Sequence, residues 1–237
     1  MGQIQYSAAR RLDRILDSQG DGTGTISQVI AATSISGATN ATPIVVTANS
    51  HGYSDGDFVH ITGVVGNTAC NDLHVIQSTT TNTFELTTPA GTNVAGNGSY
   101  DSAGSCFLCF ACKPAAGEQY CLHRYQGYVL GGANGDATKY HDQTALTNGI
   151  QVQVRQDTTL LHTLTPTPIK TGMLWGLGAE ASPIGLDFLA GAAQVWTRDF
   201  SACNVNLDGD ANEFFVVLNS DAMTVEQQLM SVQGVTI

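Results

Sequence analysis

Three cysteines lie close together in the sequence, and their spacing is one that can bind a metal. Cys106, Cys109 and Cys112 have the pattern C-x2-C-x2-C, which opens some iron–sulfur motifs. The next cysteine does not follow until Cys121, so a fourth ligand at that spacing is missing. On a strand, Cys106 and Cys112 lie on one face and Cys109 on the other. We therefore expect small buried hydrophobic residues, with no metal and no other cofactor, and Cys70 is the residue to suspect if any disulfide forms.

A second candidate for metal binding is the acidic segment near the C-terminus. Asp208, Asp210 and Asn212 supply oxygen ligands at alternate positions, as calcium loops do. The segment lacks the glycine and the glutamate of an EF-hand, because Glu213 and Asn219 stand at those two positions. A turn before the next strand explains the same residues. We expect the turn and leave a weak cation site open.

The remaining polar residues do not form a catalytic arrangement. No histidine has a serine or cysteine partner at a spacing that indicates a triad. The histidines are His51, His60, His74, His123, His141 and His162. The loop Gly131–Gly135 lacks the lysine and hydroxyl residue of a phosphate-binding loop. Asp55 and Asp57 lie beside a glycine, as in a β-turn. The sequence therefore predicts that the protein is not an enzyme.

The largest part of the chain, residues 104–237, reads as a body made of strands. Cys106–Cys112 is a nearly continuous apolar run, typical of a buried strand. Ile150–Val154 alternates strictly, which predicts a half-buried strand with its glutamines facing outward. Further strands are expected at Tyr120–Leu130, Leu160–Leu164, Ala193–Trp196, Phe214–Leu218 and Leu229–Val235. These strands predict an all-β fold whose body is a β-sandwich, jelly-roll-like in its connections.

A small β-module is expected at residues 40–103, between the body and an N-terminal segment. This segment, residues 1–39, is expected to contain a helix, a glycine-rich linker and a strand at Ile26–Ala32. Short alternating strands are predicted at Phe58–Ile61, Leu73–Ile76 and Thr83–Leu86, separated by turn residues. A module of this size buries only a small core and leans on a larger neighbour. Because insertions at loops disturb the host core little, deletion of Thr42–Ala103 is expected to leave the body folded.

The N-terminal segment carries a short amphipathic pattern at residues 5–18. Its apolar residues fall at helical spacing, which predicts a short helix. A helix of this length is marginal in water. It must dock on its own body or on another chain, and both alternatives stay open. In the second case the partner-binding residues are Arg10, Arg11, Leu12, Arg14, Ile15 and Leu16.

Charge and hydropathy exclude several kinds of partner. The chain has 9 basic and 20 acidic residues, a net charge of −11, so nucleic acid is not an expected ligand. No stretch has the pattern of a signal peptide, and the most apolar long run, residues 173–196, is interrupted by Glu180, Pro183 and Asp187. We expect no membrane partner.

The module also carries a family resemblance. It contains the pattern H-G-Y-x-x-G-D-x-V-x-I-x-G from His51 to Gly63, then an asparagine-rich turn, a T-F-x-L strand at Thr83 and a closing G-x-Y at Gly98. This order resembles the small β-domain of bacteriophage tail, fibre and head-surface proteins, which is related to a domain of ubiquitin-activating enzymes. One departure is Asp72–His74, where such domains often carry glycine and an aromatic residue. The resemblance implies a structural module displayed on a virus particle.

The body is similar, more loosely, to uncharacterised phage virion proteins. The similarity covers the segments Lys113–Tyr120, Leu146–Val152, Pro168–Thr171, Leu207–Asp210 and Val232–Val235. Together the two resemblances imply a capsid decoration or cement protein of a tailed phage, assembled in the host cytoplasm into the virion. The implied partners are the major capsid protein or other virion proteins, and further copies of the chain in a homo-oligomer. Two alternatives stay open: a tail, neck or fibre-base protein, and a carbohydrate-binding host-adhesion module.

Overall fold

The structure is a computed structural model of the 237-residue chain. It describes residues 10–17, 32–130, 146–164, 186–189, 193–199, 205–218, 220–221 and 227–236. Within these residues the fold is all-β, which confirms the predicted fold class, and the one helical element is a turn of 3₁₀ helix, η1 (Thr68–Cys70). A search of the described residues finds no helix with the length and apolar character needed to cross a membrane.

The strands follow one another along the whole chain. They are β1 (Arg10–Asp17), β2 (Thr33–Ser34), β3 (Gly37–Ala38), β4 (Val45–Thr47), β5 (Phe58–Thr62), β6 (Asp72–Gln77), β7 (Thr83–Thr87), β8 (Ser105–Cys112), β9 (Gln119–Leu130), β10 (Gln151–Gln156), β11 (Thr159–Thr163), β12 (Leu186–Leu189), β13 (Ala193–Asp199), β14 (Val205–Asp208), β15 (Glu213–Leu218) and β16 (Gln227–Thr236). Every strand predicted in the module and the body is present, with ends shifted by at most a few residues.

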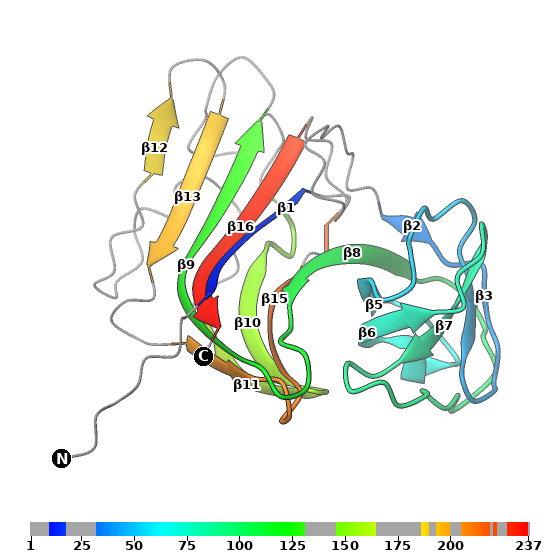
Figure 1. The fold of residues 1–237 in the computed structure, drawn as a ribbon. Coiled ribbons are helices and arrows are strands. Elements are labelled where there is room, and N and C mark those ends of the chain that lie inside the picture. Colours follow the sequence, from blue (N-terminus) through cyan, green and yellow to red (C-terminus); the bar gives the residue numbers. More distant parts are fainter. Residues whose placement is uncertain are drawn as a thin grey trace.

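In the described part of the chain the strands form two antiparallel sheets. The six-stranded sheet has the order β1-β16-β9-β13-β12, with β14 also paired to β9. The ten-stranded sheet has the order β11-β10-β15-β8-β5-β6-β7-β4-β3, with β2 paired to β8. Figure 1 shows the six-stranded sheet on the left, β2 to β7 on the right, and β8, β10 and β15 between them. A sandwich needs two sheets that pack face to face, so the sandwich arrangement of the body and its jelly-roll connectivity both stay predictions.

Strand β8 connects the module to the body. Its first five residues pair with β5, from Ser105 opposite Thr62 to Cys109 opposite Phe58. Its last three residues pair with β15, from Phe110 opposite Val217 to Cys112 opposite Phe215. The ten-stranded sheet therefore runs without a break from the module into the body, and β8 belongs to both.

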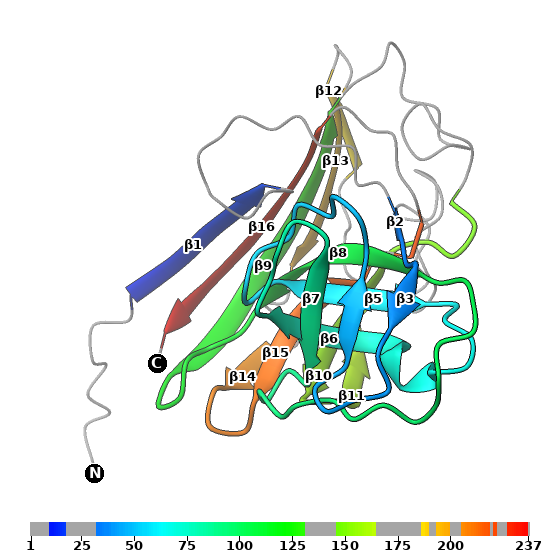
Figure 2. The ribbon, with the colours of Figure 1, turned by 90° about the vertical axis from the view of Figure 1, so that its right-hand side faces the viewer.

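The module encloses its own hydrophobic core. Strands β2 to β7 curl into a compact unit, which Figure 2 shows in front of the body. The largest fully buried side chains of this core are Ile44, Ile61, Ile76, Phe84 and Leu86. Strands β2 and β3, which precede residue 40, pair with β8 and β4 and so belong to the module's part of the sheet.

Strand β15 is buried on both faces. Phe214, Val216 and Leu218 belong to one hydrophobic cluster, and the intervening Phe215 and Val217 are also buried. A continuous apolar run is the sequence signature of such a strand, and the sequence has this run at the predicted place.

The predicted N-terminal helix is wrong, because its central residues form strand β1. This strand pairs with β16 over its full length, from Arg10 opposite Thr236 to Asp17 opposite Leu229. Intrinsic helix propensity is a weak preference, and a full ladder of backbone hydrogen bonds to a distant strand outweighs it. A strand repeats every two residues, so positions 12, 15 and 16 do not form the single stripe that a helix would give them.

Candidate functional site

The described contacts between the module and the body form a region that we call the seam. The seam consists of the contacts that β4 to β7 and their loops make with the strands and loops of the body. Its centre is apolar. Leu73 of β6 and Cys109 of β8 pack with Phe214, Val216 and Leu218 of β15 in one buried cluster. Phe58 of β5 joins this cluster, and its ring lies 5.1 Å from that of Phe214, centroid to centroid. Burial of these side chains stabilises the contact by about 25 cal/mol for each Å² removed from water.

An ion pair flanks this apolar centre. Arg155 of β10 donates to Asp72 of β6 at 3.1 Å. The side chain of Arg155 is 12% exposed and that of Asp72 is 46% exposed. Asp72 also accepts the backbone N–H of Leu73 at 2.7 Å, which fixes its carboxylate. A half-exposed pair of this kind contributes about 0–1 kcal/mol and mainly sets the orientation of the two parts.

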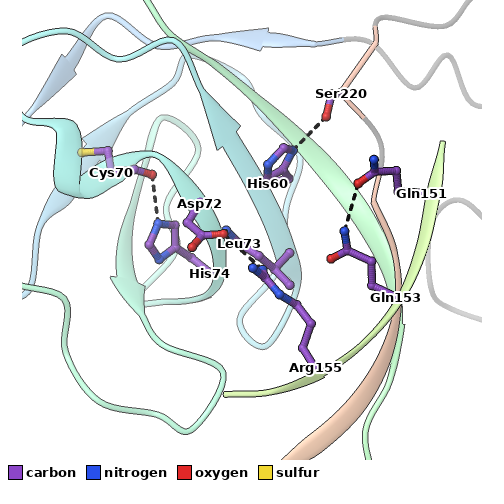
Figure 3. A network of polar contacts seen from close by, with 9 residues as sticks. All are labelled: His60, Cys70, Asp72, Leu73, His74, Gln151, Gln153, Arg155 and Ser220. Carbon is purple, nitrogen blue, oxygen red and sulfur yellow. Dashed lines mark hydrogen bonds and ion pairs between the residues drawn. The ribbon is translucent and has the colours of Figure 1, made fainter. Parts of the chain in front are cut away.

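A second polar contact joins β5 to the segment after β15. The imidazole Nδ1 of His60 and the hydroxyl of Ser220 are 3.1 Å apart. Figure 3 shows the two side chains pointing toward each other. The neighbouring residue, Asp221, holds the loop before β10, because its carboxylate accepts the backbone N–H groups of Thr147, Asn148 and Gly149 at 3.1, 3.1 and 2.7 Å. The segment of the body that His60 contacts is thus held in place by hydrogen bonds within the body.

The prediction that the glutamines of β10 face outward is wrong for Gln153, which is only 6% exposed. Gln151, Gln153 and Arg155 occupy alternate positions of β10, so their side chains lie on the same face of the strand. Arg155 contacts Asp72 of the module from this face, as Figure 3 shows. Gln153 donates to the side-chain oxygen of Gln151 at 2.9 Å. The alternation of apolar and polar residues distinguishes the two faces of β10 but does not say what covers each face. The face with the glutamines, which was predicted to meet solvent, is the face on which the module lies.

The module side of this region contains a buried histidine. His74 of β6 is 5% exposed, and its Nε2 lies 2.9 Å from the backbone oxygen of Cys70. Burial lowers the pKa of His74, and the contact with Cys70 and the charge of Asp72 oppose this effect in part. The ring is therefore neutral at neutral pH, with Nε2–H donating to Cys70.

A separate group of polar contacts joins the loop after β7 of the module to the body. The amino group of Lys113, just after β8, donates to the backbone oxygen of Pro89 and to Oδ1 of Asn212, the latter at 3.1 Å. Asp157, in the turn between β10 and β11, accepts the backbone N–H of Ala90 at 2.9 Å. Module residues 89 and 90 are thus held by two different loops of the body, and Asn212 of a third loop holds Lys113.

The acidic segment 208–212 is a turn, as expected, and its oxygens already have partners. Asp208 Oδ1 accepts the backbone N–H of Asp210 at 2.9 Å, and Asp210 Oδ1 accepts that of Gly117 at 2.8 Å. Asn212 Oδ1 accepts the amino group of Lys113. Among the described residues no group of three or more His, Cys, Asp or Glu side chains is arranged to hold a metal ion. The turn joins β14 of one sheet to β15 of the other.

The cysteines of β8 lie in different surroundings. Cys106 belongs to the module core, Cys109 belongs to the seam cluster, and Cys112 is buried opposite Phe215. These thiols and that of Cys70 are buried, as the sequence predicts. Burial raises the pKa of Cys70 and of Cys106 to about 11 each, so both thiols are protonated and unreactive at neutral pH.

The predicted partner-binding residues all lie in β1. Arg10, Arg11, Leu12, Arg14, Ile15 and Leu16 are held by the register of β1 on β16. Their helical arrangement is wrong, and their role in binding a partner stays a prediction. The glycine-rich loop at residues 131–135 and His141 lie outside the described residues.

Sequence reasoning missed the polar residues of the seam. Arg155, His60 and Ser220 carry no motif, and each meets a partner far away in the chain. The one local signal was the arginine directly after the strand Ile150–Val154, which was predicted to be half-buried, since a charge that becomes buried needs a partner.

A scan against protein-family models found no match for this chain, and a search among curated proteins found no relative.

Proposed function

We propose that the protein is a structural component of a tailed-bacteriophage particle, a decoration or cement protein that binds the outside of the capsid shell. The proposal rests first on the resemblance of residues 40–103 to the small β-domain of phage surface proteins. The observation that supports it best in the structure is the unbroken sheet from the module through β8 into the body. A module attached in this way is held in one orientation, which suits display from a particle surface.

The seam supports the same proposal. Its apolar cluster, its ion pair and the contacts of Lys113 and Asp157 join the two parts at several separate points. A hinged binding domain needs few contacts across its linker, whereas a rigid building block needs many. Many polar and sulfur-containing side chains of the described residues are buried in the core or join one loop to another, which suits a structural role.

A binding experiment with particles tests the proposal. Purified protein is mixed with capsids of the parent phage that lack it and, separately, with isolated tails, and each mixture is sedimented. Saturable binding to capsids, with a fixed number of copies in each shell, is the expected result. Binding to tails alone would replace the capsid by the tail, neck or fibre base as the site of attachment. Binding to neither particle, together with retention on a panel of host glycans, would contradict the proposal and favour an adhesion module.

A further inference from the structure

The contacts around Lys113 place an amine, a carboxamide and a carboxylate in one small region. The amino group of Lys113 lies 3.1 Å from Oδ1 of Asn212, so it is adjacent to the carboxamide carbon of that residue. The backbone oxygen of Pro89 accepts a second hydrogen bond from the same amino group. These two contacts hold the nitrogen against the side chain of Asn212.

Asp157 completes the group. Its backbone N–H donates to the backbone oxygen of Asn212 at 3.1 Å, so the two turns are fastened to each other. Its side chain accepts the N–H of Ala90, next to Pro89, at 2.9 Å. The negative charge of Asp157 raises the pKa of Lys113 and so opposes the effect of burial, which lowers it. The three side chains thus come from three loops that their backbone contacts hold in place.

The environment of Lys113 favours a reactive amine. Burial lowers the pKa of Lys113 from its ordinary value. A lysine with a lowered pKa is more often neutral, and the neutral amine is the form that attacks a carbonyl carbon. Because the amine and the carboxamide are held together, the reaction is intramolecular and gains from proximity.

We propose that Lys113 and Asn212 become joined by an amide bond between their side chains, with Asp157 carrying the proton. The Lys113 ammonium gives a proton, through water, to the Asp157 carboxylate, which lies near it but forms no ion pair with it. The freed lone pair of Nζ attacks Cγ of Asn212. The bond between Cγ and Nδ2 then breaks. The leaving nitrogen, which already carries two hydrogens, takes one proton from the carboxyl of Asp157 and one from the attacking amine, and it departs as an ammonium ion. The reaction needs no oxidant and no other reactant.

Such a bond would close a large loop across the body. Lys113 and Asn212 are 99 positions apart in the sequence, and each lies in a connection that passes from one sheet to the other. The link would therefore fix both crossings and hold the loop that carries Pro89 of the module. This inference concerns the folded chain alone and does not depend on the proposed function.

Mass spectrometry of the full chain tests the proposal directly. The folded wild-type protein is expected to be lighter than its sequence mass by one molecule of ammonia. Protease digestion should yield a branched peptide that joins the segment with Lys113 to the segment with Asn212. Folded wild-type protein that keeps its full sequence mass after prolonged incubation would overturn the proposal.

Three variants provide the controls. Lys113→Arg keeps the charge without the nucleophile, and Asn212→Gly removes the carboxamide at a position whose φ of 56° glycine adopts easily. Both are expected to keep their full mass. Asp157→Asn keeps the shape of the side chain without the proton carrier and is expected to form the link at least tenfold more slowly. Loss of ammonia from Lys113→Arg would place the reaction elsewhere, for example at Asn97 before Gly98, and would contradict the proposal. Cross-linking of Asp157→Asn at the wild-type rate would remove Asp157 from it.

Discussion

At the scale of single residues, the structure depends on a few positions where backbone segments come very close. The connection 113–118 and the turn 209–212 lie against each other, because Gly209 donates its N–H to the backbone oxygen of Glu118 at 3.0 Å. A Cβ atom on Gly209 would lie 1.9 Å from the backbone oxygen of Ala115 and 2.7 Å from its carbon. No side chain can relieve such a contact, so only glycine fits.

Gly209→Ala is therefore expected to destabilise the protein by about 2–4 kcal/mol, because one of the two sheet crossings must move. Urea unfolding followed by circular dichroism measures the change. Gly37→Ala is the matched control, since a Cβ atom there meets Thr47 at 3.4 Å and longer, an ordinary contact distance. Equal stability of the two variants would show that the turn 209–212 shifts freely.

His74 gives the stability a dependence on pH. Its pKa in the folded protein is lowered, so the unfolded chain binds the proton more readily than the folded chain does. The contribution of His74 to stability is complete above the unfolded pKa of about 6.5 and falls as the pH drops below that value. Unfolding by urea at pH 7.5 and at pH 5 should show a smaller loss for His74→Gln, whose amide can still donate to Cys70, than for the wild type. His162→Gln, at an exposed position of β11, should behave as the wild type does.

At the scale of elements, the sequence predicted strands well where a local pattern alone defines them. The alternation of Ile150–Val154 and the apolar run of Phe214–Leu218 both correspond to strands, β10 and β15, that the structure contains. The predictions failed where a distant segment decides. Strand β1 exists because β16, at the other end of the chain, offers it a full ladder. Gln153 is buried because the module covers it. Neither the pairing of β1 with β16 nor the burial of Gln153 can be predicted from a local sequence pattern.

The same reasoning explains why the polar groups of the seam could not be found. Lys113, Asn212 and Asp157 lie in three separate connections between strands. Asparagine and aspartate are common in turns for local reasons, so neither residue indicated a contact with Lys113. Only the topology of the two sheets brings these connections together.

Truncation of β1 tests the pairing that replaced the predicted helix. Removal of residues 1–17 should expose the edge of β16, because β1 is its neighbour on that side. An uncovered edge of ten residues offers unpaired N–H and C=O groups to other chains, so lower thermal stability and aggregation are expected. Size-exclusion chromatography and thermal unfolding measure both effects, with removal of residues 1–9 as the control. If both truncated proteins were as stable and monodisperse as the full chain, β1 would not be needed to cover β16.

At the scale of the whole molecule, the module and the body behave as one unit in this architecture. Strand β8 loses its partner β5 when the module is removed, and Phe214, Val216 and Leu218 lose the cover of Leu73 and Phe58. The sequence alone predicted that the body would survive this deletion. The shared sheet and the shared cluster point to the opposite result.

Deletion of Thr42–Ala103, with a short Gly/Ser bridge, is expected to give an insoluble or unfolded body.

A milder change, Phe58→Ala, is expected to lower the free energy of unfolding by about 2–3 kcal/mol, since Phe58 is only partly buried. It should lower the stability of the whole protein in a single transition, because the seam couples the two parts. Urea unfolding followed separately by far-ultraviolet circular dichroism and by tryptophan fluorescence, from Trp175 and Trp196 of the body, tests this coupling. Two separated transitions in the wild type would show that the parts fold independently.

The charge distribution leads to a prediction about the proposed attachment to a phage particle. The net charge is −11, yet three of the nine basic residues, Arg10, Arg11 and Arg14, lie together in β1 at the edge of the six-stranded sheet. If this strand meets an acidic surface of the capsid, reversal of the three charges to glutamate should weaken binding to capsids at low salt by at least tenfold. The difference should shrink as salt is added, since exposed charges are screened over about 10 Å at 0.1 M. Replacement of all three by lysine keeps the charge and is expected to leave binding nearly unchanged. Binding of the glutamate variant that equals the wild type at every salt concentration, with β-type circular dichroism intact, would show that β1 serves the fold of its own chain and not attachment.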